Sequence, residues 1–492
     1  MPETSELLAL IRSRAPIIVV ESREEPRIKE LVFQVCYSVK LPAFAWNVLD
    51  GLMPLGTPVR PDSSLTLPAD LLRHLWNLKL AGVFVLMDFH PYLTEPMNIR
   101  LLKQISQTSE LYNQTIILLS QEITVPEELK VFTSNLPIQL PDARELRMVV
   151  DSAIKKWYTL NPGQTITVNQ EAVELLVRNL NGLTASEADR LTRRAMSNKS
   201  ITLDSIPEVA QAKYEMLNQG GVLTYEHETA QFSEVGGLSN LKQWLQRRQA
   251  VFLGTTSVQG IDIPKGILML GVQGSGKSLA AKAVAGTWRV PLLRLDFGAL
   301  YDKYFGETER KTRDSLKMAE MMAPCVLWLD EIEKGIATGN DGDSGTSRRL
   351  LGTLLTWMAE RKSAVFVVAT ANDIQALPPE LMRKGRMDEI FFVDLPDEET
   401  RKEILTIHLR KRKLDPAQFD LYHIAQACDG FSGAEIEQCV VAGLYSLIGG
   451  GGVLTNEILL NEIGATRPLS VIMSEKINAM REWAKERTVP AN

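Results

Sequence analysis

Short apolar runs recur along this chain, and the stretches between them have the apolar spacing of amphipathic helices. In the second half, buried strands are predicted at 267–270, 292–295, 326–329, 364–369 and 390–393. Strands that alternate with helices favour a parallel sheet with helices on both faces. The predicted fold class is therefore α/β.

The first of these strands runs into a glycine-rich loop, G-V-Q-G-S-G-K-S, from Gly271 to Ser278. Its glycines allow backbone N–H groups to converge on phosphates, Lys277 supplies a positive charge, and the Ser278 hydroxyl is a ligand for Mg²⁺. The loop predicts an ATP or GTP site; a glycine-rich turn with an unrelated lysine is disfavoured because further ATPase elements follow it. The residues expected to contact nucleotide are Val272, Gln273, Gly274, Ser275, Gly276, Lys277, Ser278 and Leu279.

Three polar side chains follow the next strands of the predicted sheet. Asp330 and Glu331 come directly after 326–329, at the edge where parallel sheets bind their ligands. We expect Asp330 to hold Mg²⁺ through its water shell and Glu331 to activate water as the general base. Asn372, after the strand at 364–369, is expected to hydrogen-bond that water or the γ-phosphate. The alternative for the acidic pair is a helix cap.

A basic turn, L-M-R-K-G-R-M-D, leads into the last strand and contains Arg383 and Arg386. The order of phosphate loop, Asp-Glu strand, Asn strand and basic turn resembles the AAA ATPases. The resemblance implies a P-loop module of parallel sheet and helical lid that forms a ring, expected to be a hexamer. It also implies that both arginines reach the ATP of the neighbouring subunit and assist catalysis. The alternative is a pair of solvated arginines.

The same resemblance implies contacts to the adenosine part of ATP. Val235 and Gly236 lie in E-V-G-G-L, which resembles the segment whose backbone contacts adenine in this family. His408 is similar to the lid histidine that lies against the ribose, although a packed helix histidine is an alternative. Gly433 and Ala434 lie in G-F-S-G-A-E, which resembles the lid turn beside the nucleotide.

The segment K-Y-F-G-E stands where the family places the loop that projects into the central pore of the ring. Large flat side chains bury area without requiring a particular partner sequence, so Tyr304 and Phe305 are the residues expected to grip a polypeptide. The alternative is core packing. The acidic, glycine-rich stretch 339–345 predicts a second exposed loop.

The first half repeats this plan without a phosphate loop. The paired segments are, in order, 16–21 with 266–271, 83–88 with 325–330, 116–120 with the Asn372 strand, and 182–187 with 430–435. Four pairs in one order indicate a tandem duplication. The alternative is the general likeness of any two α/β domains.

The first copy has lost the chemistry of the second. Glu24, Glu25 and Pro26 open the helix that would receive a phosphate, and acids there complement the helix dipole and repel phosphate. Phe89 stands at the position assigned to the second carboxylate, and Ser120 stands near that of Asn372. This half is therefore expected to bind no ATP and to act as a scaffold or adaptor.

The predicted division of the chain has six parts. They are a degenerate AAA-like α/β domain (1–140), a small helical lid-like domain (141–200), a linker (201–230), the large AAA ATPase domain (231–397), its helical lid (398–470) and a C-terminal helix (471–492). A final helix in this family often packs against the next subunit. The whole plan, with motifs at 10–16 and 87–93, resembles an AAA family of cyanobacteria and algal plastids known as a conserved hypothetical chloroplast reading frame. That resemblance implies a connection with photosynthetic or inorganic-carbon physiology.

Composition narrows the class of protein. The net charge of −6 argues against nucleic-acid binding by the whole surface, and the basic cluster at 310–313 favours a solvated or intersubunit face. We expect no membrane span, and the start Met1-Pro2-Glu3 lacks a leader, which predicts the cytoplasm, or the plastid stroma for a plastid-encoded protein. The four cysteines lack metal-ligand spacing, so the metal expected is Mg²⁺ carried with ATP.

The predicted function is Mg²⁺-dependent ATP hydrolysis by a homo-oligomeric ring that remodels or threads a protein substrate. Two alternatives remain open. One is an ATP-switched scaffold that recruits partners without threading. The other is an ATPase stimulated by nucleic acid, which the net charge disfavours.

Overall fold

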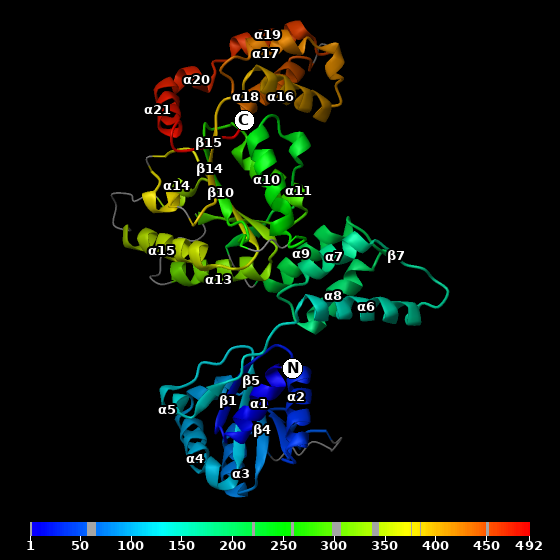
Figure 1. The fold of residues 1–492 in the computed structure, drawn as a ribbon, viewed down its shortest axis with the longest axis vertical. Helices are drawn as coiled ribbons and strands as arrows, with labels where there is room; N and C mark the ends of the chain where they lie inside the picture. Colours follow the sequence, from blue (N-terminus) through cyan, green and yellow to red (C-terminus); the bar gives the residue numbers. More distant parts are fainter. Residues whose placement is uncertain are drawn as a thin grey trace. The chain divides into compact units, whose positions relative to one another are not determined.

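The computed structural model describes residues 2–56, 65–218, 222–256, 260–297, 307–336, 344–374, 376–383, 385–448 and 452–492. Two compact units divide the chain: Met1–Asp142 with Leu183–Ala188, and Ala143–Gly182 with Asp189–Asn492. Each unit is built on a parallel sheet with helices on its faces, which confirms the predicted α/β class (Figure 1).

The first unit contains a six-stranded sheet in the order β3-β2-β4-β5-β1-β6, parallel except for β3. Its strands are β1 (Ile17–Glu21), β2 (Ala43–Asn47), β3 (Gly51–Pro54), β4 (Gly82–Met87), β5 (Gln114–Ser120) and β6 (Thr133–Asn135). Helices α1 (Pro2–Arg12) and α2 (Glu25–Ser38) pack on one face, and α3 (Pro68–Leu78) and α4 (Pro96–Tyr112) pack on the other. Shorter helices are η2 (His90–Thr94) and α5 (Glu127–Lys130). Every residue of β4 and β5 is buried, as continuous apolar runs predict for central strands.

The second unit contains a seven-stranded sheet in the order β15-β14-β10-β13-β12-β11-β9. Its strands are β9 (Leu223–Tyr225), β10 (Gly266–Gly271), β11 (Leu292–Leu295), β12 (Cys325–Leu329), β13 (Val365–Ala371), β14 (Glu389–Val393) and β15 (Val489–Pro490). Helices α10 (Ser239–Phe252) and α11 (Lys277–Trp288) cover one face, and α13 (Glu307–Met321) and α15 (Ser344–Glu360) cover the other. Short helices are η3 (Phe232–Glu234), α14 (Ile332–Ile336) and η4 (Pro379–Met382).

The two sheets have one topology. The order β2-β4-β5-β1-β6 in the first unit corresponds to β11-β12-β13-β10-β14 in the second, and each series continues into an antiparallel edge strand, β3 or β9. Strand order is a stronger test of duplication than apolar spacing because many α/β sheets with the same spacing have other orders. The shared order supports the tandem repeat.

Two sets of helices accompany the second sheet (Figure 1). The lid has its own core and consists of α16 (Glu398–Lys411), η5 (Pro416–Gln418), α17 (Leu421–Ala427), α18 (Gly433–Tyr445) and α19 (Asn456–Ala465). The lid-like region contains α6 (Ala143–Leu160), α7 (Gln170–Asn179) and α8 (Ala185–Ala195), with a strand pair, β7 (Thr167–Val168) and β8 (Ser200–Ile201).

The segment predicted as a linker, 201–230, is structured over most of its described length. It contains α9 (Ser205–Leu217) and then β9, which adds an antiparallel edge to the ATPase sheet. The Tyr214 hydroxyl donates to the Leu223 carbonyl at 2.6 Å, and the buried Lys213 Nζ donates to the Asn181 carbonyl at 2.6 Å. These contacts make the connector part of the second unit.

The C-terminal segment also differs from its prediction. Two helices, α20 (Leu469–Ile472) and α21 (Ser474–Ala484), replace a single one, and β15 then pairs with β14. Met480 and Ala484 are buried in the core of the same chain, and Arg481 pairs with Asp394 at 2.9 Å. The described C-terminal helix therefore packs against its own ATPase domain, and its contact with the next subunit stays a prediction.

Two further observations concern the chain as a whole. The cysteines are buried and unpaired. Each helix in the described ranges is too short or too polar to cross a membrane.

Candidate nucleotide site

The phosphate loop leaves the buried strand β10 and enters α11, as the motif predicts. Helix α11 begins directly after Gly276, whose φ of 94° lies in the left-handed region that favours glycine. Gly274 has a φ of 76°, and a Cβ at this position would lie 3.0 Å from the Ser432 hydroxyl of the lid turn. The two glycines therefore let the loop turn sharply beneath the lid and bring the N-terminus of α11 to the cavity.

Lys277 is buried at the start of α11, with 5% of its surface exposed. Its Nζ donates to the carbonyl oxygens of Gly271 at 2.9 Å and Val272 at 2.7 Å. Burial lowers the pKa of Lys277 to about 8, against the opposite effect of nearby carboxylates. A buried ammonium held by neutral carbonyls is stabilised further when phosphate oxygens come within reach.

Asp330 lies where β12, β13 and α11 meet. Its Oδ1 accepts from the Thr370 hydroxyl at 2.7 Å and from the Ser278 hydroxyl at 3.3 Å. Its Oδ2 is 3.8 Å from the Arg294 guanidinium on β11. Two hydroxyls thus orient the carboxylate and a cation faces its other oxygen.

Glu331 has a φ of 48°, and its N–H donates to the Thr370 hydroxyl at 3.0 Å. Its carboxylate accepts from the Asn372 side chain at 2.9 Å and pairs with Lys334. The backbone N–H of Asn372 donates to the buried Glu333 carboxylate at 2.9 Å, and burial raises the pKa of Glu333. Glu331 and Asn372 are therefore joined to each other and to the end of β13.

The lid closes the other side of the site. The N–H of Ala434 donates to the Gly274 carbonyl at 3.1 Å, which joins the lid turn to the phosphate loop. His408 lines the cavity, and its Nδ1 lies 3.3 Å from the Glu437 carboxylate. Burial lowers the pKa of His408. This histidine is thus packed in the lid and also lines the cavity, and its contact with the ribose stays a prediction.

These residues surround one cavity of about 380 Å³, within the usual size of a small-ligand site. Of the residues predicted to contact nucleotide, Val272 lies outside the lining, because it is buried and its carbonyl holds Lys277. The lining residues are Glu234, Val235, Gly236, Gln273, Gly274, Ser275, Gly276, Lys277, Ser278, Leu279, Asp330, Glu331, Thr370, Asn372, Ile404, Ile407, His408, Gly433, Ala434 and Glu437.

The donor set fits Mg²⁺ that arrives with a nucleotide. Ser278 and Asp330 present a hydroxyl and a carboxylate, the hard oxygen donors that Mg²⁺ prefers. Within the described residues, no group of three or more His, Cys, Asp or Glu side chains is arranged to hold a metal by itself. A metal here would therefore need phosphate oxygens and water to complete its coordination.

The two predicted arginines are not part of the lining of this cavity. Arg383 is exposed after η4, and Arg386 donates to the Glu380 carbonyl; neither lines the cavity of its own chain. Tyr304 and Phe305 lie outside the described residues.

The matching region of the first unit has one carboxylate where the second has two. Asp88 directly follows β4 as Asp330 directly follows β12, and it accepts from the Ser120 hydroxyl at 3.2 Å, as Asp330 accepts from the Thr370 hydroxyl. Its φ of 51° is close to the 48° of Glu331. Phe89, the next residue, is buried and carries no carboxylate.

Known proteins resemble the chain over its whole length. The N-terminal domain of SpoVK-like AAA ATPases matches residues 3–136, the second domain of those proteins matches 144–220, and the ATPase family associated with various cellular activities (AAA) matches 267–395. The AAA domain-containing protein ycf46 of Pyropia yezoensis is 34% identical over 487 residues, covering 98% of this chain and 97% of the relative. That of Trieres chinensis is 33% identical over 494 residues, with coverage of 98% and 97%. A proteasome-activating nucleotidase of Aeropyrum pernix is 34% identical over 284 residues, covering 55% of this chain and 67% of the relative.

Proposed function

We propose, from the premise that this chain belongs to the ycf46 family of AAA domain-containing proteins and is an ATP-hydrolysing enzyme, that a ring of its subunits uses ATP hydrolysis to remodel or thread a protein substrate. The observation that carries the proposal is the cavity in which the phosphate loop, the Asp-Glu pair, Asn372 and the lid turn meet. A relative over the ATPase half is named as a proteasome-activating nucleotidase, which supports a protein substrate.

Each side chain in the cavity has a role that follows from its position. The Lys277 ammonium would exchange its carbonyl partners for β- and γ-phosphate oxygens. Ser278 and Asp330 would hold Mg²⁺, which when bound neutralises charge on the phosphates. Glu331 would take the proton of the attacking water while the Asn372 amide orients that water or the γ-phosphate.

Glu331 must first leave its present partners. Its carboxylate is held by Asn372 and Lys334, whose donors occupy its oxygens. When a γ-phosphate engages the Asn372 amide, the carboxylate loses that donor and can accept from water instead. The arrangement therefore favours hydrolysis after nucleotide has bound.

The arginines would act on the neighbouring subunit. Arg383 and Arg386 lie outside the cavity of their own chain, and Arg383 is exposed. A guanidinium supplied in trans stabilises charge on the transferring phosphoryl group and contributes about 10³- to 10⁵-fold in rate. A ring in which each subunit completes the next one's site would give them this function. Tyr304 and Phe305 would then grip the substrate in the pore.

The test is the molar mass in solution of the Glu331→Gln variant, with and without ATP and Mg²⁺. We expect a hexamer with nucleotide, because the amide of this variant cannot serve as a base and bound ATP persists. Lys277→Ala is the matched control and should stay in its nucleotide-free state under both conditions. A Glu331→Gln variant that binds ATP and remains a monomer would overturn the ring and the trans-acting arginines.

A further inference from the structure

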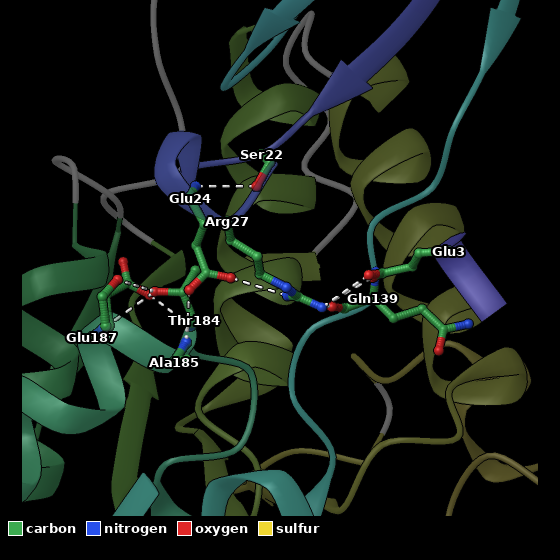
Figure 2. Close-up of polar contacts among 9 residues, drawn as sticks. Glu3, Ser22, Glu24, Arg27, Gln139, Thr184, Ala185 and Glu187 are labelled. Carbon is green, nitrogen blue, oxygen red and sulfur yellow. Dashed lines mark hydrogen bonds and ion pairs between the residues drawn. The ribbon is translucent and has the colours of Figure 1, made fainter. Parts of the chain in front are cut away.

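A buried carboxylate stands in the first unit where the second has its phosphate loop. Glu24 follows β1 just as Gly274 follows β10, and only 7% of its surface is exposed. Its Oε1 accepts from the backbone N–H of Ala185 at 3.0 Å, and its Oε2 accepts from Arg27 at 3.1 Å (Figure 2). Both oxygens of this carboxylate are therefore used by donors within the protein.

The donor Ala185 belongs to a turn that repeats the lid turn of the ATPase. Thr184 and Glu187 form a capping box, with Thr184 N–H donating to the Glu187 carboxylate at 2.9 Å. Ser432 and Glu435 form the same box at the start of α18, with the corresponding bond at 2.8 Å. Leu183–Ala188 lies in the first unit, so Glu24 and this turn are parts of one body.

The two modules close this turn by different bonds. In the ATPase, the lid turn reaches the phosphate loop through a backbone bond from Ala434 to the Gly274 carbonyl, and the nucleotide cavity lies beside it. In the first unit, the bond from Ala185 ends on the charged side chain of Glu24. Arg23 adds an ion pair with Glu187 at 3.4 Å. A side-chain anion thus stands at the N-terminus of α8, a position that attracts anions.

Arg27, the second donor to the Glu24 carboxylate, is itself held in place. Arg27 lies between two carboxylates and donates to both oxygens of Glu3 at 3.2 and 3.0 Å (Figure 2). Glu3 has 4% of its surface exposed and also accepts from the Gln139 N–H at 2.8 Å. Buried charges are costly unless they are paired and hydrogen-bonded, and here each is. The network therefore joins α1, the loop after β1, the strand-to-lid connection and the lid turn.

We infer that Glu24 is a built-in anion that replaces the nucleotide in closing the first module. Its carboxylate holds the start of α8 through a charge-assisted hydrogen bond, with Arg27 and Glu3 as the supporting pair. The lid turn of this module is therefore closed without any ligand, and its closure does not follow the ATP cycle of the second module.

Hydrogen exchange on the full chain tests this inference. In Glu24→Ala, amides at 183–188 should exchange about ten- to a hundredfold faster, the change expected when a hydrogen bond to a charged acceptor is lost. Glu25→Ala, a change of the same kind at the first residue of α2, should leave these amides unchanged. Added ATP should slow exchange around Lys277 in the wild type and leave 183–188 as they were.

Unchanged exchange at 183–188 in Glu24→Ala would overturn the inference, and so would ATP-dependent protection there in the wild type. Glu24→Gln serves as the second variant if Glu24→Ala does not fold, because glutamine keeps the shape of glutamate and one acceptor oxygen. Exchange at 183–188 in Glu24→Gln should be faster than in the wild type and slower than in Glu24→Ala. Sulfate at matched ionic strength should restore protection in Glu24→Ala more than chloride does, because the freed Arg27 and α8 N-terminus attract it. Equal effects of the two salts would show that Glu24 is an ordinary cap and not an anion in place of phosphate.

Discussion

The two α/β modules of this chain share strand order and lid turn but use opposite charges after their first strand. In the second, glycines and Lys277 leave a cavity that suits an anion from solution. In the first, the carboxylate of Glu24 is the anion, and both of its oxygens accept hydrogen bonds from donors of the protein. One fold can therefore hold its lid turn either beside an open cavity or on a buried side-chain carboxylate.

The largest effect is expected from Arg383 in the basic turn, a segment that the first module lacks. Arg383→Ala should lower the rate of ATP hydrolysis by about 10³-fold or more if the guanidinium acts on a neighbour's phosphates. Phosphate release at saturating ATP measures this, with the molar mass as a control for assembly. A mixed ring of Arg383→Ala and Lys277→Ala subunits should regain activity, because the Arg383→Ala subunits keep an intact cavity and receive arginines from their neighbours. Failure of the mixture to recover would contradict action in trans.

The next effect compares two carboxylates with one backbone conformation. Glu331→Gln should lower hydrolysis by about 10²- to 10⁴-fold, the contribution of a general base, while ATP binding persists. Asp88→Asn, the matching change in the first module, should leave the rate of hydrolysis equal to that of the wild type within experimental error. The measurement is single-turnover hydrolysis together with nucleotide affinity. A comparable loss in both variants would show that the first module takes part in catalysis.

The sequence predicted the site residues that are marked by their immediate neighbours in the chain. It did not predict those that depend on contacts between distant segments. The phosphate loop, Asp330, Glu331 and Asn372 each follow a strand directly, so local pattern was enough to place them. Glu333 meets Asn372 because β12 pairs with β13, and Arg294 meets Asp330 because β11 pairs with β12. The local sequence carries no signal of either pairing. Strands β9 and β15 are three and two residues long, too short for any periodicity, and both depend on an existing sheet edge.

The same limit applied to the first module. The prediction that Glu24 disfavours phosphate depends only on its place at a helix start, which is local. The bond between Glu24 and Ala185 spans 161 residues of sequence and depends on the fold of the whole module. The match of Asp88 with Asp330 rested on the apolar strands before them, and in the structure each of the two residues directly follows its strand.

A smaller effect is expected from the protonation of Lys277. Burial lowers its pKa from 10.5 to about 8, and bound phosphates would raise it again. ATP binding then takes up a proton above about pH 8, so affinity should fall as pH rises from that point, by up to about tenfold per unit, and stay flat below it. Calorimetry at pH 7 and pH 9 in buffers of different ionisation enthalpy measures both the affinity for ATP and the number of protons taken up on binding. An affinity that is the same at both values would contradict a lowered pKa.

The smallest effect concerns Arg294, which faces the Asp330 carboxylate. Its guanidinium lies 3.8 Å from Asp330 and 3.9 Å from Glu226, with 42% of the side chain exposed. A cation there repels Mg²⁺ but is screened by water, so Arg294→Met should lower the Mg²⁺ concentration for half-maximal hydrolysis by about two- to fivefold. Arg289→Met, which removes an arginine at the far end of α11, is the matched control. A higher Mg²⁺ requirement in Arg294→Met would mean that this arginine serves chiefly to hold Asp330 in place, and that the orientation it gives outweighs the repulsion.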